Sequence, residues 1–87
     1  MRWIITEDII DNGDSIGAVG FDGTPIAHGD QLIEFRLLDG DDEVYFNGQA
    51  DRAVYGTEEG FEPLDDFGAG WGCVEIQYLE SGHWVTL

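Results

Sequence analysis

The chain has 87 residues, of which 43% are hydrophobic and 13% aromatic, and its formal net charge is −16. This length predicts one domain, residues 1–87, and the aromatic content excludes a disordered acidic tail. A single cysteine excludes an internal disulfide, and the absence of a long apolar run or a basic leader predicts neither a membrane span nor a signal peptide, so we expect a cytoplasmic protein.

The N-terminal third contains one clear strand pattern and two weaker segments. "RWIIT" (2–6) is rich in β-branched and aromatic residues and predicts a strand. "EDIIDNGDS" (7–15) is compatible with a helical turn closed by Asn12-Gly13 and equally with a hairpin turn on the same pair. "IGAVGF" (16–21) predicts a weak, glycine-rich strand, and "DGTPIAHGD" (22–30) predicts a loop.

Residues 31–50 form the most regular part of the sequence. Ile33, Phe35 and Leu37 alternate with polar residues, and the alternation resumes in "EVYFNGQA" after Asp39-Gly40. Alternation with a period of two on both sides of an Asp-Gly pair is a strong hairpin signal. The acids of "DGDDE" (39–43) are therefore expected at an exposed hairpin tip.

The last third contains an irregular segment and a second hairpin. Between residues 51 and 72, Phe61, Leu64, Phe67 and Trp71 recur at spacings of three, three and four, which predicts short helical turns attached to the core. "CVEIQYLE" (73–80) alternates, and Ser81-Gly82 predicts a turn into "HWVTL" (83–87). The fold class is therefore mainly β or α+β: a small antiparallel sheet of about five strands, open or curled, with one short helical segment.

The charge is the strongest functional signal. Nineteen acids stand against three arginines, and the chain has no lysine. A folded protein of this size exposes roughly 5,000 Å², or about 300 Å² for each net negative charge. Duplex DNA carries one phosphate per on the order of 100 Å². Acids gathered on about a third of the surface would therefore equal the charge density of DNA.

Three groups of acids are the candidate partner-binding residues. They are the predicted hairpin tip (Asp39, Asp41, Asp42, Glu43), the irregular segment (Glu58, Glu59, Glu62, Asp65, Asp66) and the N-terminal group (Asp8, Asp11, Asp14).

Calcium binding and catalysis are both disfavoured by the sequence. A twelve-residue calcium loop needs Gly at position 6 and Glu at position 12, and loops started at Asp39 or at Asp11 lack both. His28, His83 and Cys73 have no neighbours that indicate a catalytic arrangement. We therefore expect no enzyme activity, no catalytic residues, no metal and no cofactor.

In size, acidity, aromatic content and lack of a catalytic signature, the chain resembles the small DNA-mimic inhibitors of phages and mobile elements, which include anti-CRISPR proteins, uracil-DNA glycosylase inhibitor and anti-restriction proteins. These inhibitors share no fold or motif, so the resemblance implies no residue-level role. It implies a protein in the bacterial cytosol that binds a basic nucleic-acid-binding protein or a Cas effector complex and blocks its nucleic-acid channel. Like charge disfavours nucleic acid itself as a ligand, and exposed edge strands allow either a monomer or a homodimer.

Two other functions would account for the same composition. An antitoxin or immunity protein that neutralises a basic toxin needs the same electrostatics. A small structural domain adapted to high salt would also be acidic and poor in lysine, and it would unfold in low salt.

Overall fold

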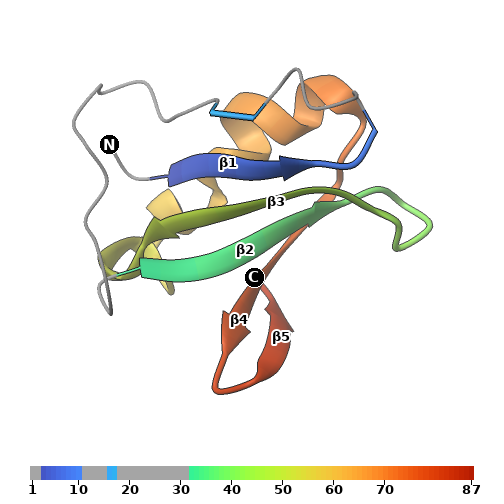
Figure 1. The fold of residues 1–87 in the computed structure, drawn as a ribbon. Coiled ribbons are helices and arrows are strands. Elements are labelled where there is room, and N and C mark those ends of the chain that lie inside the picture. The colour runs from blue at the N-terminus through green and yellow to red at the C-terminus, as the bar shows by residue number, and fades with distance from the viewer. Residues whose placement is uncertain (1–2, 11–15, 18–31) are drawn as a thin grey trace.

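A computed structural model describes residues 3–10, 16–17 and 32–87 of the chain. Five strands form one antiparallel sheet in the order β1-β3-β2-β4-β5 (Figure 1). Their bounds are β1 (Trp3–Asp8), β2 (Leu32–Leu38), β3 (Val44–Asp51), β4 (Glu75–Glu80) and β5 (His83–Thr86). The predicted mainly β fold with an antiparallel sheet is confirmed, and the sheet is open because β1 and β5 form its two edges.

The hairpin of β2 and β3 forms where the alternating pattern predicts it. Phe35 pairs with Gly48 and Ile33 with Ala50, so the apolar residues of both strands lie on one face of the sheet. The connection is the five-residue loop 39–43, and the residue with a left-handed backbone is Asp42 (φ 62°), not Gly40. Asp tolerates this conformation better than most residues, so the loop closes without a glycine at that point.

The second hairpin joins β4 and β5 through a two-residue turn at the predicted pair. Ser81 and Gly82 both have positive φ angles, of 50° and 82°. This is the combination required by a type I′ turn, whose twist matches that of the flanking strands. The turn pairs Glu80 with His83, and all four residues of β5 are exposed.

Short helical turns cover one face of the sheet, as Figure 1 shows in yellow and orange. After η2 (Arg52–Val54) come η3 (Glu58–Phe61), η4 (Pro63–Phe67) and η5 (Gly68–Trp71), of which η4 is a π-helical turn and the others are 3₁₀ turns. We call residues 58–71 the covering segment, the sheet face that it covers the inner face, and the opposite one the open face.

Aromatic contacts hold the covering segment to the inner face. The Phe67 ring lies 4.8 Å from that of Phe46 and 6.0 Å from that of Trp3, and the Trp71 ring lies 5.6 Å from that of Phe46. Phe61, Leu64 and Phe67 are partly buried against the core. The prediction that this irregular segment is attached to the core through regularly spaced apolar residues is confirmed.

The centre of the core lies around Tyr78 on β4, which is fully buried. Its hydroxyl donates a hydrogen bond of 2.7 Å to the carbonyl oxygen of Gly60, and its ring packs on those of Phe35 and Tyr55. Burial raises the pKa of this hydroxyl above its usual range, with a smaller contribution from the charge of Glu62. The hydrogen bond satisfies a buried polar group and connects β4 to the covering segment.

Some sequence-based predictions fall partly or wholly outside the described residues. The first strand begins at Trp3 and continues to Asp8, because Asp8 still pairs with Phe46 across a bulge after Ile5. The strand predicted at 16–21 begins instead with a turn at residues 16 and 17, and its remainder lies outside the described residues, as do the loop 22–30, the Asn12-Gly13 turn and His28.

Replacing Gly48 with alanine is expected to destabilise the fold by about 1–3 kcal/mol. A Cβ atom at Gly48 would lie 2.4 Å from Cζ of Phe35, whose ring is fully buried, and 2.5 Å from the backbone carbonyl oxygen of Ile4. Gly40→Ala is the matched control, because Gly40 is exposed and has open space around it. Urea unfolding of both variants tests the prediction, and equal stabilities would contradict it.

Stability is expected to fall as the pH rises above 9. Burial raises the pKa of the Cys73 thiol from 9.0 to about 11. The unfolded chain therefore loses the thiol proton first, and each pH unit between the two values removes up to about 1.4 kcal/mol of stability. Urea unfolding at pH 9 and pH 10 measures this slope.

Cys73→Ala provides the control for the alkaline slope. This variant should show a flatter dependence between pH 9 and pH 10, whatever the cost of the substitution at neutral pH. If wild type and variant lose the same stability over that interval, the thiol does not contribute to the slope.

Candidate protein-binding surfaces

The predicted acidic hairpin tip, residues 39–43, is an ordered turn. Oδ1 of Asp39 accepts hydrogen bonds from the backbone N–H groups of Asp41 (2.8 Å) and Glu43 (2.9 Å). The bond from Glu43, followed by those from Asp41 and from the Tyr45 side chain, holds the pKa of the Asp39 carboxyl below its usual range. Asp39 therefore shapes the loop, while Asp41, Asp42 and Glu43 are exposed.

Asp8 lies at the same end of the sheet as the hairpin tip. Asp8 pairs with Phe46, and the backbone N–H of Ile9 donates to the carbonyl oxygen of Tyr45 at 2.9 Å. Oδ1 of Asp8 accepts a hydrogen bond of 3.2 Å from the N–H of Ile10, so this carboxylate also supports a local turn. The structure thus brings one residue of the N-terminal group to the tip, whereas Asp11 and Asp14 lie outside the described residues.

The acids of the covering segment lie on a different surface. The chain leaves β3 at the end opposite the hairpin tip and returns across the inner face (Figure 1). Four of these acids are exposed and Glu62 is half-buried; the group is Glu58, Glu59, Glu62, Asp65 and Asp66. The described acids therefore form at least two separate surfaces.

The open face of the sheet carries a hydrogen-bonded network that the sequence did not predict. Nε of Arg36 donates to Oε1 of Gln77 (2.7 Å), and Nε2 of Gln77 donates to Oε2 of Glu75 (2.6 Å). The Arg36 guanidinium lies 4.2 Å from the ring centroid of Trp84. Hydrogen bonds from Thr86 and then from Gln77 lower the pKa of the Glu75 carboxyl. The network holds Trp84 against the open face.

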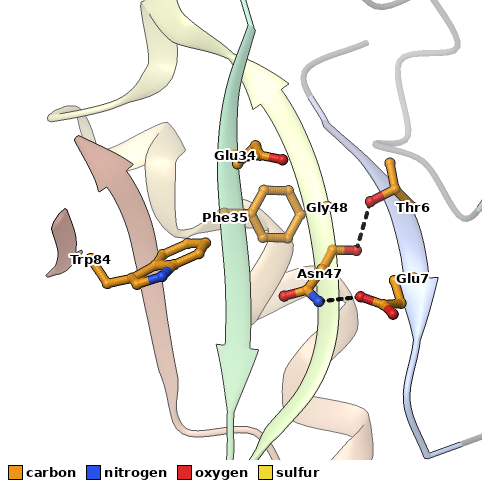
Figure 2. A pocket seen from close by; sticks show the side chains of 7 residues that line it. All are labelled: Thr6, Glu7, Glu34, Phe35, Asn47, Gly48 and Trp84. Atoms are coloured by element: carbon orange, nitrogen blue, oxygen red, sulfur yellow. Dashed lines mark hydrogen bonds between the residues drawn. The ribbon is translucent and has the colours of Figure 1, made fainter. Parts of the chain in front are cut away.

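A shallow pocket of about 220 Å³ lies on the open face beside this network (Figure 2). Its lining comes from four strands and consists of Thr6, Glu7, Glu34, Phe35, Asn47, Gly48 and Trp84. Nδ2 of Asn47 donates to Oε1 of Glu7 at 2.5 Å, and the hydroxyl of Thr6 donates to the carbonyl oxygen of Asn47 at 3.3 Å. These bonds connect β1 to β3 at the rim of the pocket.

The candidate residues chosen from the sequence do not include any that line this pocket. Alternation along β2 was sufficient to place Glu34 on the face opposite Phe35. Alternation could not predict that Glu34 lies near Glu7 and Trp84, because that proximity depends on the strand order β1-β3-β2-β4-β5. Sequence reasoning therefore identified clustered acids and missed acids that only tertiary pairing brings together.

No charged side chain among the described residues is buried. Arg52 forms an ion pair of 3.8 Å with Glu80, and both side chains are about half exposed. Exposed pairs of this kind contribute about 0–1 kcal/mol, so this pair does not offset the repulsion among the acids. In the part of the chain that the structure describes, the negative charge lies at the surface.

Comparison of the chain with protein-family models, with curated proteins and with solved structures finds no match. Within residues 3–10, 16–17 and 32–87, no three His, Cys, Asp or Glu side chains are grouped so that they could hold a metal ion. None of the described helical segments has the length and hydropathy needed to cross a membrane.

Removing the Asp39 carboxylate is expected to loosen the hairpin tip. Asp39→Ala deletes the acceptor of two backbone bonds, so the amide hydrogens of Asp41 and Glu43 should exchange faster with solvent. Asp39→Asn keeps one acceptor oxygen and should retain most of the protection. Hydrogen exchange followed by NMR measures both rates.

The protection of these two amides should also depend on pH in one direction. The two backbone donors lower the Asp39 pKa, so the stabilisation is complete above the ordinary aspartate pKa and is lost as the pH falls through the lowered one. Equal protection in wild type, Asp39→Ala and Asp39→Asn would show that the carboxylate does not order the tip.

Proposed function

We propose that the protein is a non-enzymatic inhibitor that imitates nucleic acid and occupies the basic DNA- or RNA-binding cleft of a bacterial defence or DNA-processing protein. A Cas effector complex is the favoured target, and the site of action is the bacterial cytosol. The partner is a protein, because like charge repels nucleic acid.

The observation that carries this proposal is the uncompensated surface charge. The chain has a net charge of −16, and the described carboxylates lie at the surface, not in the core. Both described arginines are engaged, Arg36 by Gln77 and Trp84 and Arg52 by Glu80. A net charge of magnitude about 2–8 is sufficient to keep a small domain soluble, so the excess indicates another use.

The ordered hairpin tip supports the proposal through its rigidity. Phosphate contacts dominate the affinity of a basic cleft for nucleic acid. A carboxylate imitates a phosphate well when it is already held in place, since less conformational entropy is then lost on binding. The Asp39 bonds fix the loop that carries Asp41, Asp42 and Glu43, and the loop extends beyond the end of the sheet (Figure 1).

The sheet supports the proposal through its spacing. Residues i and i+2 of a strand lie about 6.6 Å apart on one face, which is comparable to the distance between successive phosphates of one strand. Open-face acids on neighbouring strands extend the charge from the tip along the sheet, because Glu75 on β4 pairs with Leu38 next to the tip and Glu34 on β2 lies further along. The tip is the centre of the proposed interface because Asp8 and three exposed acids meet there.

Capture of a partner from bacterial lysate tests the proposal. The immobilised protein should retain a nucleic-acid enzyme or Cas effector complex that excess duplex DNA elutes before salt does, because both ligands would compete for one cleft. A partner that DNA leaves in place would contradict mimicry and favour a toxin–antitoxin pair. Failure to capture any specific partner, together with unfolding in low salt, would favour a salt-adapted domain.

Paired charge reversals identify the surface that makes the contact. Asp41→Lys with Glu43→Lys should weaken binding of the captured partner by about tenfold or more. Asp65→Lys with Asp66→Lys makes the same charge change on the covering segment and should weaken it less. Thermal unfolding confirms that both variants fold. Equal binding by wild type and both variants would contradict the proposal.

A further inference from the structure

We propose that the pocket on the open face binds one cationic side chain, an arginine or a lysine, of the basic partner. The inference rests on the proposed function, because it takes that side chain to belong to the partner that the protein inhibits. The binding chemistry of the pocket is separate from that function, and it can be measured without the partner.

The size of the pocket suits a side chain. Sites for drug-sized ligands and cofactors occupy about 300–1,000 Å³. This pocket, at about 220 Å³, is smaller and lies open on the surface of the sheet. In Figure 2, Phe35 and Gly48 lie between Trp84 on one side and Thr6 and Glu7 on the other.

The charge of the pocket favours a cation. Glu7 and Glu34 both line it, and none of the described residues that line it is basic. The Asn47 amide engages Oε1 of Glu7, which orients this carboxylate and leaves Oε2 as an acceptor among the described residues. Glu34 is exposed and has no hydrogen-bonded or ionic partner in the described part of the chain. The pocket thus offers acceptors to a group that carries N–H donors and positive charge.

Trp84 supplies an apolar wall that is already in position. Arg36 stacks on its indole at 4.2 Å, and Arg36 is itself fixed by Gln77. An arginine or lysine buries its methylene stem against such a surface while its charged end stays at the carboxylates, and an indole also attracts cations directly. Because Trp84 is held before the ligand arrives, less entropy is lost on binding.

A metal ion suits this pocket less well than an organic cation does. Two carboxylates line it, and no group of three potential metal ligands occurs within the described residues. Ca²⁺ takes six to eight oxygen ligands, and transition metals prefer nitrogen or sulfur donors that the pocket lining does not contain. A guanidinium or ammonium group needs only the two carboxylates and the indole that are present.

Titration with single-residue probes tests the proposal. N-acetyl-arginine amide and N-acetyl-lysine amide carry one positive charge each, and N-acetyl-glutamine amide is the neutral control. In two-dimensional NMR spectra, the cationic probes should produce saturable shifts at the backbone amides of Asn47 and Gly48 and at the Trp84 indole N–H. The neutral probe should produce none.

Matched variants separate the pocket from the general charge of the protein. Glu34→Gln should raise the dissociation constant of the cationic probes about threefold or more, because one acceptor loses its charge. Asp65→Asn removes the same charge from the covering segment and should leave that constant unchanged. Shifts that do not saturate, or equal effects of the two variants, would overturn the proposal.

The captured partner separates failure of the pocket from failure of the proposed function. If duplex DNA displaces the partner, and Glu34→Gln weakens its binding more than Asp65→Asn does, both proposals hold. If DNA displaces the partner but the two variants bind it equally, the pocket proposal is wrong and mimicry stands. If DNA does not displace the partner while the probes still saturate the pocket, mimicry fails and the cation site remains.

Discussion

The packing of Phe46 against Phe67 and Trp71, whose rings also contact each other, connects the two layers of the protein. These rings join the centre of the sheet to the covering segment at centroid distances of 4.8 and 5.6 Å. The contact matters because a thin core must balance the repulsion of 16 net negative charges. Tyr78 adds a second connection through its hydrogen bond to Gly60. Both connections bury aromatic rings, which gain dispersion and hydrophobic energy that salt bridges at this surface would not supply.

The same division into layers determines where the acids lie. Because the inner face is buried, the charged residues of β1, β2, β3 and β4 are not part of the core. The other described acids lie in the loops and in the covering segment. The hairpin tip adjoins one end of β3 and the covering segment crosses the inner face, so their acids lie on different parts of the surface. A partner that binds this protein in a single cleft would therefore contact mainly one of these two surfaces. The paired charge reversals show which surface it is.

The open face of the sheet carries acidic side chains beside a hydrogen-bonded network that holds Arg36 and Trp84 in place. Arg36 is the described cation on this face, and its hydrogen bond and its stacking are directed at Gln77 and Trp84, not at Glu34. This arrangement holds a large aromatic side chain in place and leaves a neighbouring carboxylate to solvent. Interfaces obtain most of their energy from a few preorganised aromatic and charged anchors. In the proposed cation site, Trp84 and Glu34 would be such anchors, and the other carboxylates would supply longer-range attraction.

The local features of the fold follow from patterns in the amino-acid sequence. Alternation in 31–50 and 73–87 specified two hairpins, because a period of two leaves each strand only one face to bury. The spacing of Phe61, Leu64, Phe67 and Trp71 indicated the attachment of an irregular segment to the core, and the composition indicated an acidic surface.

The way in which these strands and segments combine depends on contacts between distant parts of the chain. The strand order places β1 beside β3 and β4 beside β2, and this order brings Asp8 to the hairpin tip and Glu7, Glu34 and Trp84 to one pocket. These residues are separated by up to 77 positions in the chain, and no local pattern encodes their proximity. Local periodicity fixes which face a side chain occupies, whereas pairing between distant strands depends on burying all the apolar faces at once.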